Sequence, residues 1–162
     1  MQNIESLLVG GKSIENWDRL WSTVEGGFRH YHPELRPVVG LYRVWFKGQI
    51  VVIGTGTDKA GGLAKRLSDF IRPSPSARKY RAGSRIYERR DELLVEVLII
   101  GSDRQAREIA RQLKGPMIER HRPLWTAPAR SPDTFKRPRK RKPKRAGLKT
   151  KLTPYTGTIP KA

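Results

Sequence analysis

The segment GLYRVWFKGQIVVIG, residues 40–54, decides the fold because its pattern is that of a β-hairpin. Residues 38–46 and 50–53 are rich in β-branched and aromatic side chains, which favour strands. Lys47 and Gly48 lie between them, and glycine accepts the positive φ angle of a tight two-residue turn. We therefore predict two antiparallel strands joined at Lys47 and Gly48.

Outside the hairpin, apolar periodicity and capping residues predict the remaining elements. Ser13 can cap a first helix, which Gly26 and Gly27 would end. Ser102 and Gln105 form a capping box for a later helix. The full set comprises helices at 13–25, 63–71 and 102–113, a short helix from Pro116, a strand at 93–100 and a basic loop at 72–85. This order indicates an α/β sandwich with a small, mostly antiparallel central sheet flanked by helices.

The charge of the chain predicts a polyanionic partner. The 162 residues carry a formal net charge of +19, and the pI is about 11.0. Such a balance favours nucleic acid. The absence of cysteine excludes disulfides and thiolate zinc sites. No apolar run approaches the roughly 18 residues of a membrane span, and the N-terminus has no secretion signal, so we expect no membrane partner.

The positive charge is concentrated towards the C-terminus. Residues 127–162 carry twelve Lys or Arg and one acid, a balance of +11, which leaves +8 for residues 1–126. The run KRPRKRKPKR, residues 136–145, contains two prolines and no apolar periodicity. It cannot bury enough apolar surface to offset the entropy cost of ordering. We predict an N-terminal helical extension at 1–36, a folded domain at 37–126 and a disordered basic tail at 127–162.

The hairpin and the segments after it resemble the GIY-YIG nuclease superfamily. Residues 40–42, Gly-Leu-Tyr, match the first tripeptide of the family, and residues 52–54, Val-Ile-Gly, match the second except for its tyrosine. The segment GLAKRLSDF, residues 62–70, matches the helix that carries the essential arginine, here Arg66. The segment RPLWT, residues 122–126, matches the closing segment, with threonine where asparagine is usual. The resemblance covers roughly residues 38–126 and implies a GIY-YIG-like fold.

The resemblance also implies a nuclease centre, but several of its positions are changed. Family members cut DNA with one divalent metal held by a glutamate, while tyrosines and the arginine position water and the scissile phosphate. Tyr42 and Arg66 are retained as candidate catalytic residues. Val52 replaces the second tyrosine, Phe70 stands where tyrosine or histidine is common, and Lys114 falls at the glutamate's spacing. A protonated lysine offers no lone pair to magnesium, which prefers oxygen ligands.

These changes leave three functions open. The preferred interpretation is a DNA-binding protein whose degenerate nuclease centre does not cleave and needs no cofactor. The second is an active, divergent endonuclease that rebuilds a magnesium or manganese site, with Glu119 as the candidate metal ligand. The third is an RNA- or ribosome-associated module, for which tryptophans offer candidate stacking surfaces: Trp17, Trp21, Trp45 and Trp125, of which the first two have the spacing of core residues. Whether the chain is an enzyme therefore stays open at this point.

The candidate nucleic-acid contacts fall into two groups. The folded group would position a phosphate backbone: Arg66, Arg72, Arg78, Lys79, Arg81 and Arg85. The tail group would add nonspecific affinity by releasing counterions: Lys136, Arg137, Arg139, Lys140, Arg141, Lys142, Lys144 and Arg145. With DNA as the expected partner, we predict a cytoplasmic or nucleoid location in a bacterium. In a eukaryotic cell the same basic run would act as a nuclear import signal.

Overall fold

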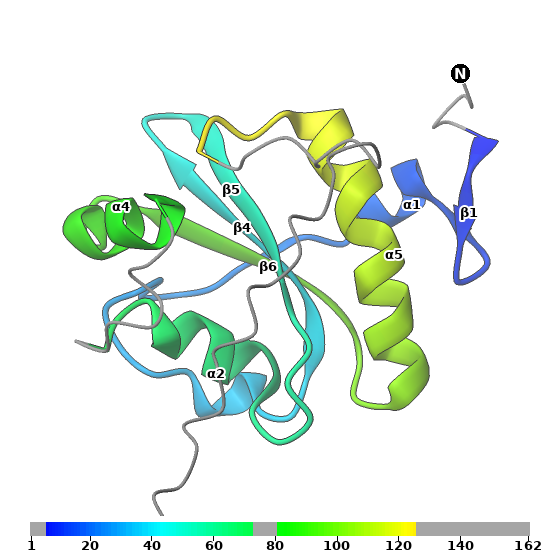
Figure 1. Ribbon diagram of the computed structural model, residues 1–162, viewed down its shortest axis with the longest axis horizontal. Coiled ribbons are helices and arrows are strands. Elements are labelled where there is room, and N and C mark those ends of the chain that lie inside the picture. The colour runs from blue at the N-terminus through cyan, green and yellow to red at the C-terminus, as the bar shows by residue number, and fades with distance from the viewer. Residues whose placement is uncertain (1–5, 73–80, 126–162) are drawn as a thin grey trace, which may run out of the picture. The chain divides into compact units, whose positions relative to one another are not determined.

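The computed structural model describes residues 6–72 and 81–125 (Figure 1). The chain divides into two units, 1–130 and 131–162, and all described residues belong to the first. In chain order the elements are β1 (Leu8–Val9), β2 (Lys12–Ser13), α1 (Ile14–Asp18), β3 (Ser22–Thr23), the 3-10 helix η2 (Pro33–Leu35), β4 (Val39–Phe46), β5 (Gln49–Gly56), α2 (Gly62–Asp69), α4 (Arg81–Arg89), β6 (Leu94–Gly101) and α5 (Arg104–His121).

The predicted hairpin is confirmed as the centre of a four-stranded sheet. β4 and β5 pair antiparallel around Lys47 and Gly48, whose φ angles of 49° and 74° suit a tight hairpin turn. β6 pairs antiparallel with the other edge of β4, and the short β3 pairs antiparallel with β6. The strand order is β3-β6-β4-β5, so the apolar stretch that ends at Gly101 is an inner strand, as predicted. The α/β class with a small antiparallel sheet is therefore confirmed.

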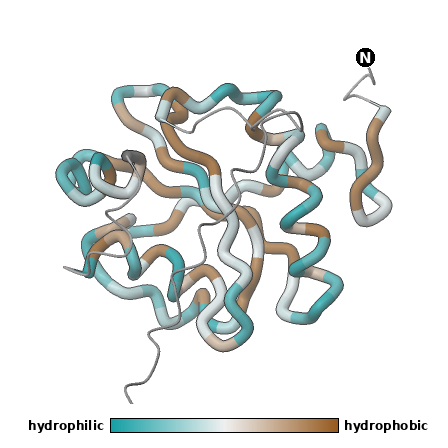
Figure 2. The backbone as a smooth tube through the Cα atoms, in the orientation of Figure 1, coloured by the Kyte–Doolittle hydropathy of each residue, from teal (hydrophilic) through white to brown (hydrophobic). Residues whose placement is uncertain are grey.

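Side chains that alternate along β4 enter two separate cores. Tyr42 and Val44 pack on one face of the sheet, with α2 and α4, whereas Leu41 packs on the other, with α1 and α5. Figure 1 shows these two helical layers, and Figure 2 shows the apolar residues along the strands between them. α5 contributes a buried stripe at helical spacing: Ala106, Ala110, Leu113 and Met117. The sheet thus fixes α2 on one side and α5 on the other.

The first helix is much shorter than predicted. Ser13 does cap it, accepting a hydrogen bond from the Asn16 backbone N–H at 3.2 Å, but the helix ends at Asp18. Ser22 then joins the sheet as β3, opposite Val97. The prediction of a helix through residue 25 was wrong because pairing with β6 supplies the backbone hydrogen bonds of residues 22–23. The helical periodicity of a short segment carries no information about a partner strand that is distant in the sequence.

Three further predictions were wrong. The expected basic loop at 72–85 is helical from residue 81, where α4 begins. α5 is capped by Asp103, not Ser102, because the Asp103 side chain accepts from the Ala106 N–H at 2.7 Å. It also continues through Pro116 as one helix. Proline removes one helical hydrogen bond, but the buried stripe of α5 runs past it and packs the helix on the sheet.

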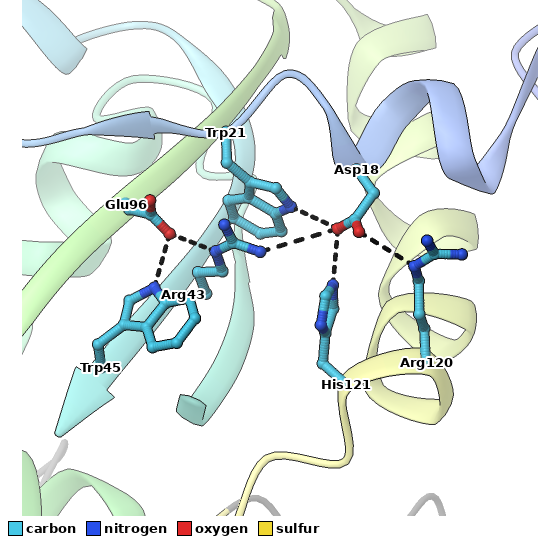
Figure 3. Close-up of polar contacts among 7 residues, drawn as sticks. All are labelled: Asp18, Trp21, Arg43, Trp45, Glu96, Arg120 and His121. Atoms are coloured by element: carbon cyan, nitrogen blue, oxygen red, sulfur yellow. Dashed lines mark hydrogen bonds and ion pairs between the residues drawn. The ribbon is translucent and has the colours of Figure 1, made fainter. Parts of the chain in front are cut away.

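An ionic cluster around Asp18 ties the end of α1 to the end of α5 (Figure 3). The carboxylate accepts hydrogen bonds from Trp21 Nε1 at 2.9 Å and from Arg120 Nε at 3.0 Å. His121 Nε2 lies 2.6 Å from the same carboxylate. Because Arg120 and His121 are the last residues of α5, these contacts hold the C-terminal end of that helix in place.

Arg43 of β4 extends this cluster across the sheet (Figure 3). Its guanidinium lies over the rings of Trp21 and Trp45, at 4.5 Å and 5.2 Å from the ring centroids. It donates a hydrogen bond to Glu96, its cross-strand partner on β6, and Trp45 Nε1 donates to the same carboxylate at 2.6 Å. Arg43 also lies 3.7 Å from Asp18, so one cation joins both carboxylates.

We expect acid to destabilise the fold through these two carboxylates. Burial alone would raise the pKa of both carboxyl groups. Hydrogen bonds from His121 and Trp21 nevertheless lower the pKa of Asp18 below its ordinary value of 3.8. Hydrogen bonds from Arg43 and Trp45 likewise lower the pKa of Glu96 below its ordinary value of 4.5. A carboxyl group with a lowered pKa stabilises the folded state at any pH above its ordinary pKa. This stability is lost as the pH falls through the pKa of the group in the folded protein. Urea unfolding at about pH 7, 5 and 3 should show the loss mainly below about pH 5.

The matched variant for this experiment is Asp18→Asn. It should unfold more easily than the wild type at neutral pH, and the difference between the two proteins should shrink in acid. Parallel stability curves for the two proteins across the whole pH range would contradict the role assigned to Asp18.

Candidate nucleic-acid interface

A cleft of about 760 Å³ lies along β5, the edge strand of the sheet. It brings together four of the positions that the sequence singled out: Tyr42 from β4, Val52 from β5, Arg66 from α2 and Lys114 from α5. Trp125, from the segment after α5, also lines it. Side chains from β4, β5 and α2, which follow one another in the chain, thus meet side chains from α4, α5 and the segment after α5 at one site.

Tyr42 and Arg66 form the floor of this cleft. Tyr42 is 2% exposed, and the positive charge of Arg66 lies close enough to the hydroxyl group to act on the pKa of the phenol. Burial raises the pKa of Tyr42, and the neighbouring Arg66 charge only partly offsets this effect, so the phenol is neutral at physiological pH. The hydroxyl group is therefore a neutral polar group beside Arg66 at the cleft.

Two glycines of the hairpin make this arrangement possible. Gly54 of β5 is the cross-strand partner of Tyr42, and the tyrosine side chain lies over it. A Cβ atom at Gly54 would lie 2.3 Å from the Tyr42 hydroxyl oxygen. A Cβ atom at Gly40 would lie 1.9 Å from the backbone oxygen of Leu98 on β6. The first glycine leaves room for the tyrosine at the cleft, and the second lets β4 approach β6 closely.

Phe70 supports the cleft from below and is not one of the side chains that line it. It is 5% exposed, and its ring meets the Tyr42 ring edge-on with centroids 5.7 Å apart. The Arg66 guanidinium lies 5.0 Å from the Phe70 centroid. The sequence singled out Phe70 as a changed catalytic position, and the structure places it as packing beneath the two retained residues.

The charges in the cleft are mixed, with a net positive balance. Three cations, on Lys65, Arg66 and Lys114, face two carboxylates, on Asp58 and Asp69. Lys65 Nζ lies 3.6 Å from Asp58 and 3.8 Å from Asp69, so both carboxylates share one ammonium group. Lys114 is exposed. Lys65, Asp58 and Asp69 were missed from the sequence, although the four-residue spacing of Lys65 and Asp69 on a helix was a usable signal.

Asp58 also stabilises the turn that precedes α2. Its side chain accepts hydrogen bonds from the backbone N–H groups of Gly61 at 2.7 Å and Ala60 at 3.0 Å, just before α2 begins. These bonds, the one from Gly61 first, lower the pKa of Asp58 below 3.8. An ionised Asp58 therefore orders the turn that leads into the helix of Arg66.

Glu119, the candidate metal ligand, does not join this group. It is exposed on α5 and is absent from the residues that line the cleft. It lies five positions after Lys114, which places the two side chains about 140° apart around the helix. Within residues 6–72 and 81–125, no group of three or more Asp, Glu or His side chains is arranged to hold a metal ion.

The other predicted contacts are only partly described. Arg72 is exposed just beyond α2, and Arg85 of α4 lies over the Trp125 ring at 5.5 Å. Arg81 is the first residue of α4. The remaining predicted contacts lie outside the described residues: Arg78, Lys79, Lys136, Arg137, Arg139, Lys140, Arg141, Lys142, Lys144 and Arg145. Among the described residues, the candidate contact surface of the folded domain therefore consists of the cleft and α4.

Comparisons of the chain with protein-family models, with curated proteins and with solved structures found no match. Among the described helices, none combines the length and apolar character that a bilayer crossing requires.

Proposed function

We propose that the chain binds DNA through a GIY-YIG-like domain whose nuclease centre is degenerate, and that the basic tail adds nonspecific affinity. The observation that carries this proposal is that Tyr42, Arg66 and Lys114 line one cleft. These residues come from three elements on both faces of the sheet, so their meeting is a property of the fold. Together they suit the phosphate groups of a nucleic-acid backbone.

Arg66 and Lys114 have distinct roles in this proposal. The planar guanidinium of Arg66 can donate two parallel hydrogen bonds to a phosphate. Lys114 supplies a mobile point charge at the rim of the cleft. In the resembled nucleases a glutamate and a divalent metal occupy that position, with a combined charge of +1. A lysine carries the same net charge, so it can attract phosphate without supplying the Lewis acid that hydrolysis needs.

A second candidate function is favoured by one observation. Asp58 and Asp69 line the same cleft as Tyr42 and Arg66, and carboxylates are the ligands that magnesium and manganese prefer. A divergent endonuclease could hold a metal there. Both carboxylates already contact Lys65, and Asp58 also accepts two backbone hydrogen bonds, so a metal would have to displace an ammonium group. Phosphate binding without cleavage needs no such rearrangement.

Arg66→Ala and Lys114→Ala should each weaken duplex DNA binding by residues 1–130 about tenfold. This size follows from the loss of one charge-assisted hydrogen-bonding contact. The tail is omitted so that its own affinity does not mask the cleft. The matched control is Arg104→Ala, an exposed arginine about 15 Å along α5 from Lys114. Fluorescence anisotropy with a labelled duplex would measure all four proteins.

Two outcomes would contradict the proposal. Equal affinities for wild type, Arg66→Ala and Lys114→Ala would remove the cleft from the binding site. An excess of competing RNA that displaces the duplex far better than unlabelled DNA does would favour the RNA- or ribosome-associated alternative.

A further inference from the structure

Phe46 and Trp125 form an aromatic shelf beside the cleft, which we define by these two rings and the three cations over them: Lys47, Arg85 and Arg89. The ring centroids of Phe46 and Trp125 lie 5.6 Å apart, and both side chains are half-buried. Trp125 is held in place because its backbone N–H donates to the Val51 carbonyl at 2.7 Å, on the edge strand β5. Both rings also pack against the core that contains Tyr42 and Ile86, so the shelf is a fixed aromatic surface with three cations over it.

The cations of the shelf cover its aromatic faces loosely. Arg85 lies 5.5 Å from the Trp125 centroid, and Arg89 and Lys47 lie 4.9 Å and 5.2 Å from the Phe46 centroid. Lys47 and Arg89 are exposed. Cation–π contacts at exposed positions are weak, so a planar ligand can displace these side chains. An arginine that moves aside can then stack on the outer face of the same ligand.

The shelf is continuous with the cleft because Trp125 lines both. A DNA strand whose phosphate lies against Arg66 and Lys114 would therefore carry a neighbouring nucleotide past the Trp125 ring. In a duplex, the base of that nucleotide is stacked and paired within the helix. Only an unpaired base can turn its face to an aromatic side chain, and such stacking is the usual means by which proteins hold single strands.

We propose that the aromatic shelf is a base-stacking site for single-stranded DNA. The proposal rests on the phosphate-binding role of the cleft given above, and it adds a preference for unpaired bases that the cleft alone would not provide. Arginine interleaved with aromatic rings gives a sandwich in which the base lies between an aromatic face and a guanidinium. This recognition tolerates any base sequence, since every base has a π face.

The test compares a thymidine oligonucleotide with a duplex of the same number of phosphates, both titrated into the full chain at one salt concentration. Trp125→Ala should weaken binding of the single strand at least about fivefold, the lower end of the effect of losing one stacked base. Its affinity for the duplex should stay within about twofold, because the phosphate contacts are intact. Trp125→Phe should retain most single-strand affinity and remove the quenching of tryptophan fluorescence that base stacking causes.

Phe46→Leu keeps an apolar side chain at the second position and removes its aromatic face, so it provides an independent variant if Trp125→Ala unfolds. The matched control is Tyr31→Ala, which removes an aromatic side chain that is 43% exposed and is not among the residues that line the cleft. Thermal unfolding of each variant shows whether it is folded. Trp125→Ala and Phe46→Leu should lower the ratio of single-strand to duplex affinity, and Tyr31→Ala should leave it unchanged.

The inference is overturned if Trp125→Ala and Phe46→Leu are folded and leave that ratio unchanged. A uridine oligoribonucleotide that binds more tightly than the thymidine oligonucleotide would overturn the commitment to DNA. Trp125→Ala and Phe46→Leu could change the ratio of single-strand to duplex affinity while Arg66→Ala and Lys114→Ala leave both affinities unchanged. That result would support the stacking site and contradict the phosphate-binding role of the cleft. The two proposals can therefore fail separately.

Discussion

Deleting residues 131–162 should weaken duplex DNA binding about a hundredfold or more at moderate salt and leave the described domain folded. The deleted segment carries eleven Lys or Arg and one acid, Asp133. The division of the chain into units 1–130 and 131–162 places the cut between them. Each phosphate neutralised by the tail releases counterions, so the slope of log K against log salt should become shallower by about 0.9 per lost contact.

Two measurements check this result, namely binding isotherms over a series of salt concentrations and thermal unfolding of the shortened chain. A full-length variant with the eleven tail cations changed to glutamine is the matched control, because it keeps the length and removes the charge. It should bind as weakly as the deletion. An unchanged salt slope after deletion would exclude the tail from binding, and loss of cooperative unfolding would show that the boundary is misplaced.

Lys114→Glu should reduce the duplex affinity of residues 1–130 by about tenfold to a hundredfold, more than Lys114→Ala does. The substitution changes the net charge of the cleft from one positive to one negative, and it repels phosphate where the lysine attracted it. Although the new carboxylate restores the residue type of the resembled nucleases, we expect at most weak metal binding and no efficient cleavage. Val52 has no hydroxyl group to handle water, and Phe70 is buried beneath Arg66.

Nicking of supercoiled plasmid with magnesium or manganese would measure cleavage by the wild type and by Lys114→Glu, and calorimetry would measure metal binding. We expect no nicking by the wild type. Metal-dependent nicking by purified wild type that disappears in Asp69→Asn or in Glu119→Gln would overturn this prediction. It would make the protein an enzyme and identify the carboxylate that serves it.

The sequence by itself determined the elements whose signals are local. The hairpin was predictable because Lys47 and Gly48 suit the turn and the strands beside them are rich in β-branched and aromatic residues. The α2 helix and the inner strand β6 were predictable from their own apolar patterns. At the site, the resemblance singled out Tyr42, Arg66 and Lys114 together, and all three line one cleft.

The tertiary structure alone decided the features that depend on distant partners. Residues 22–23 became a strand because β6 offers them hydrogen bonds, and α5 passes through Pro116 because its buried stripe packs on the sheet. The meeting of Phe46 with Trp125 likewise requires two segments that only the tertiary fold brings together, namely β4 and the segment after α5. Local propensity is worth only a fraction of a kcal/mol per residue, so long-range pairing and burial override it wherever the two disagree.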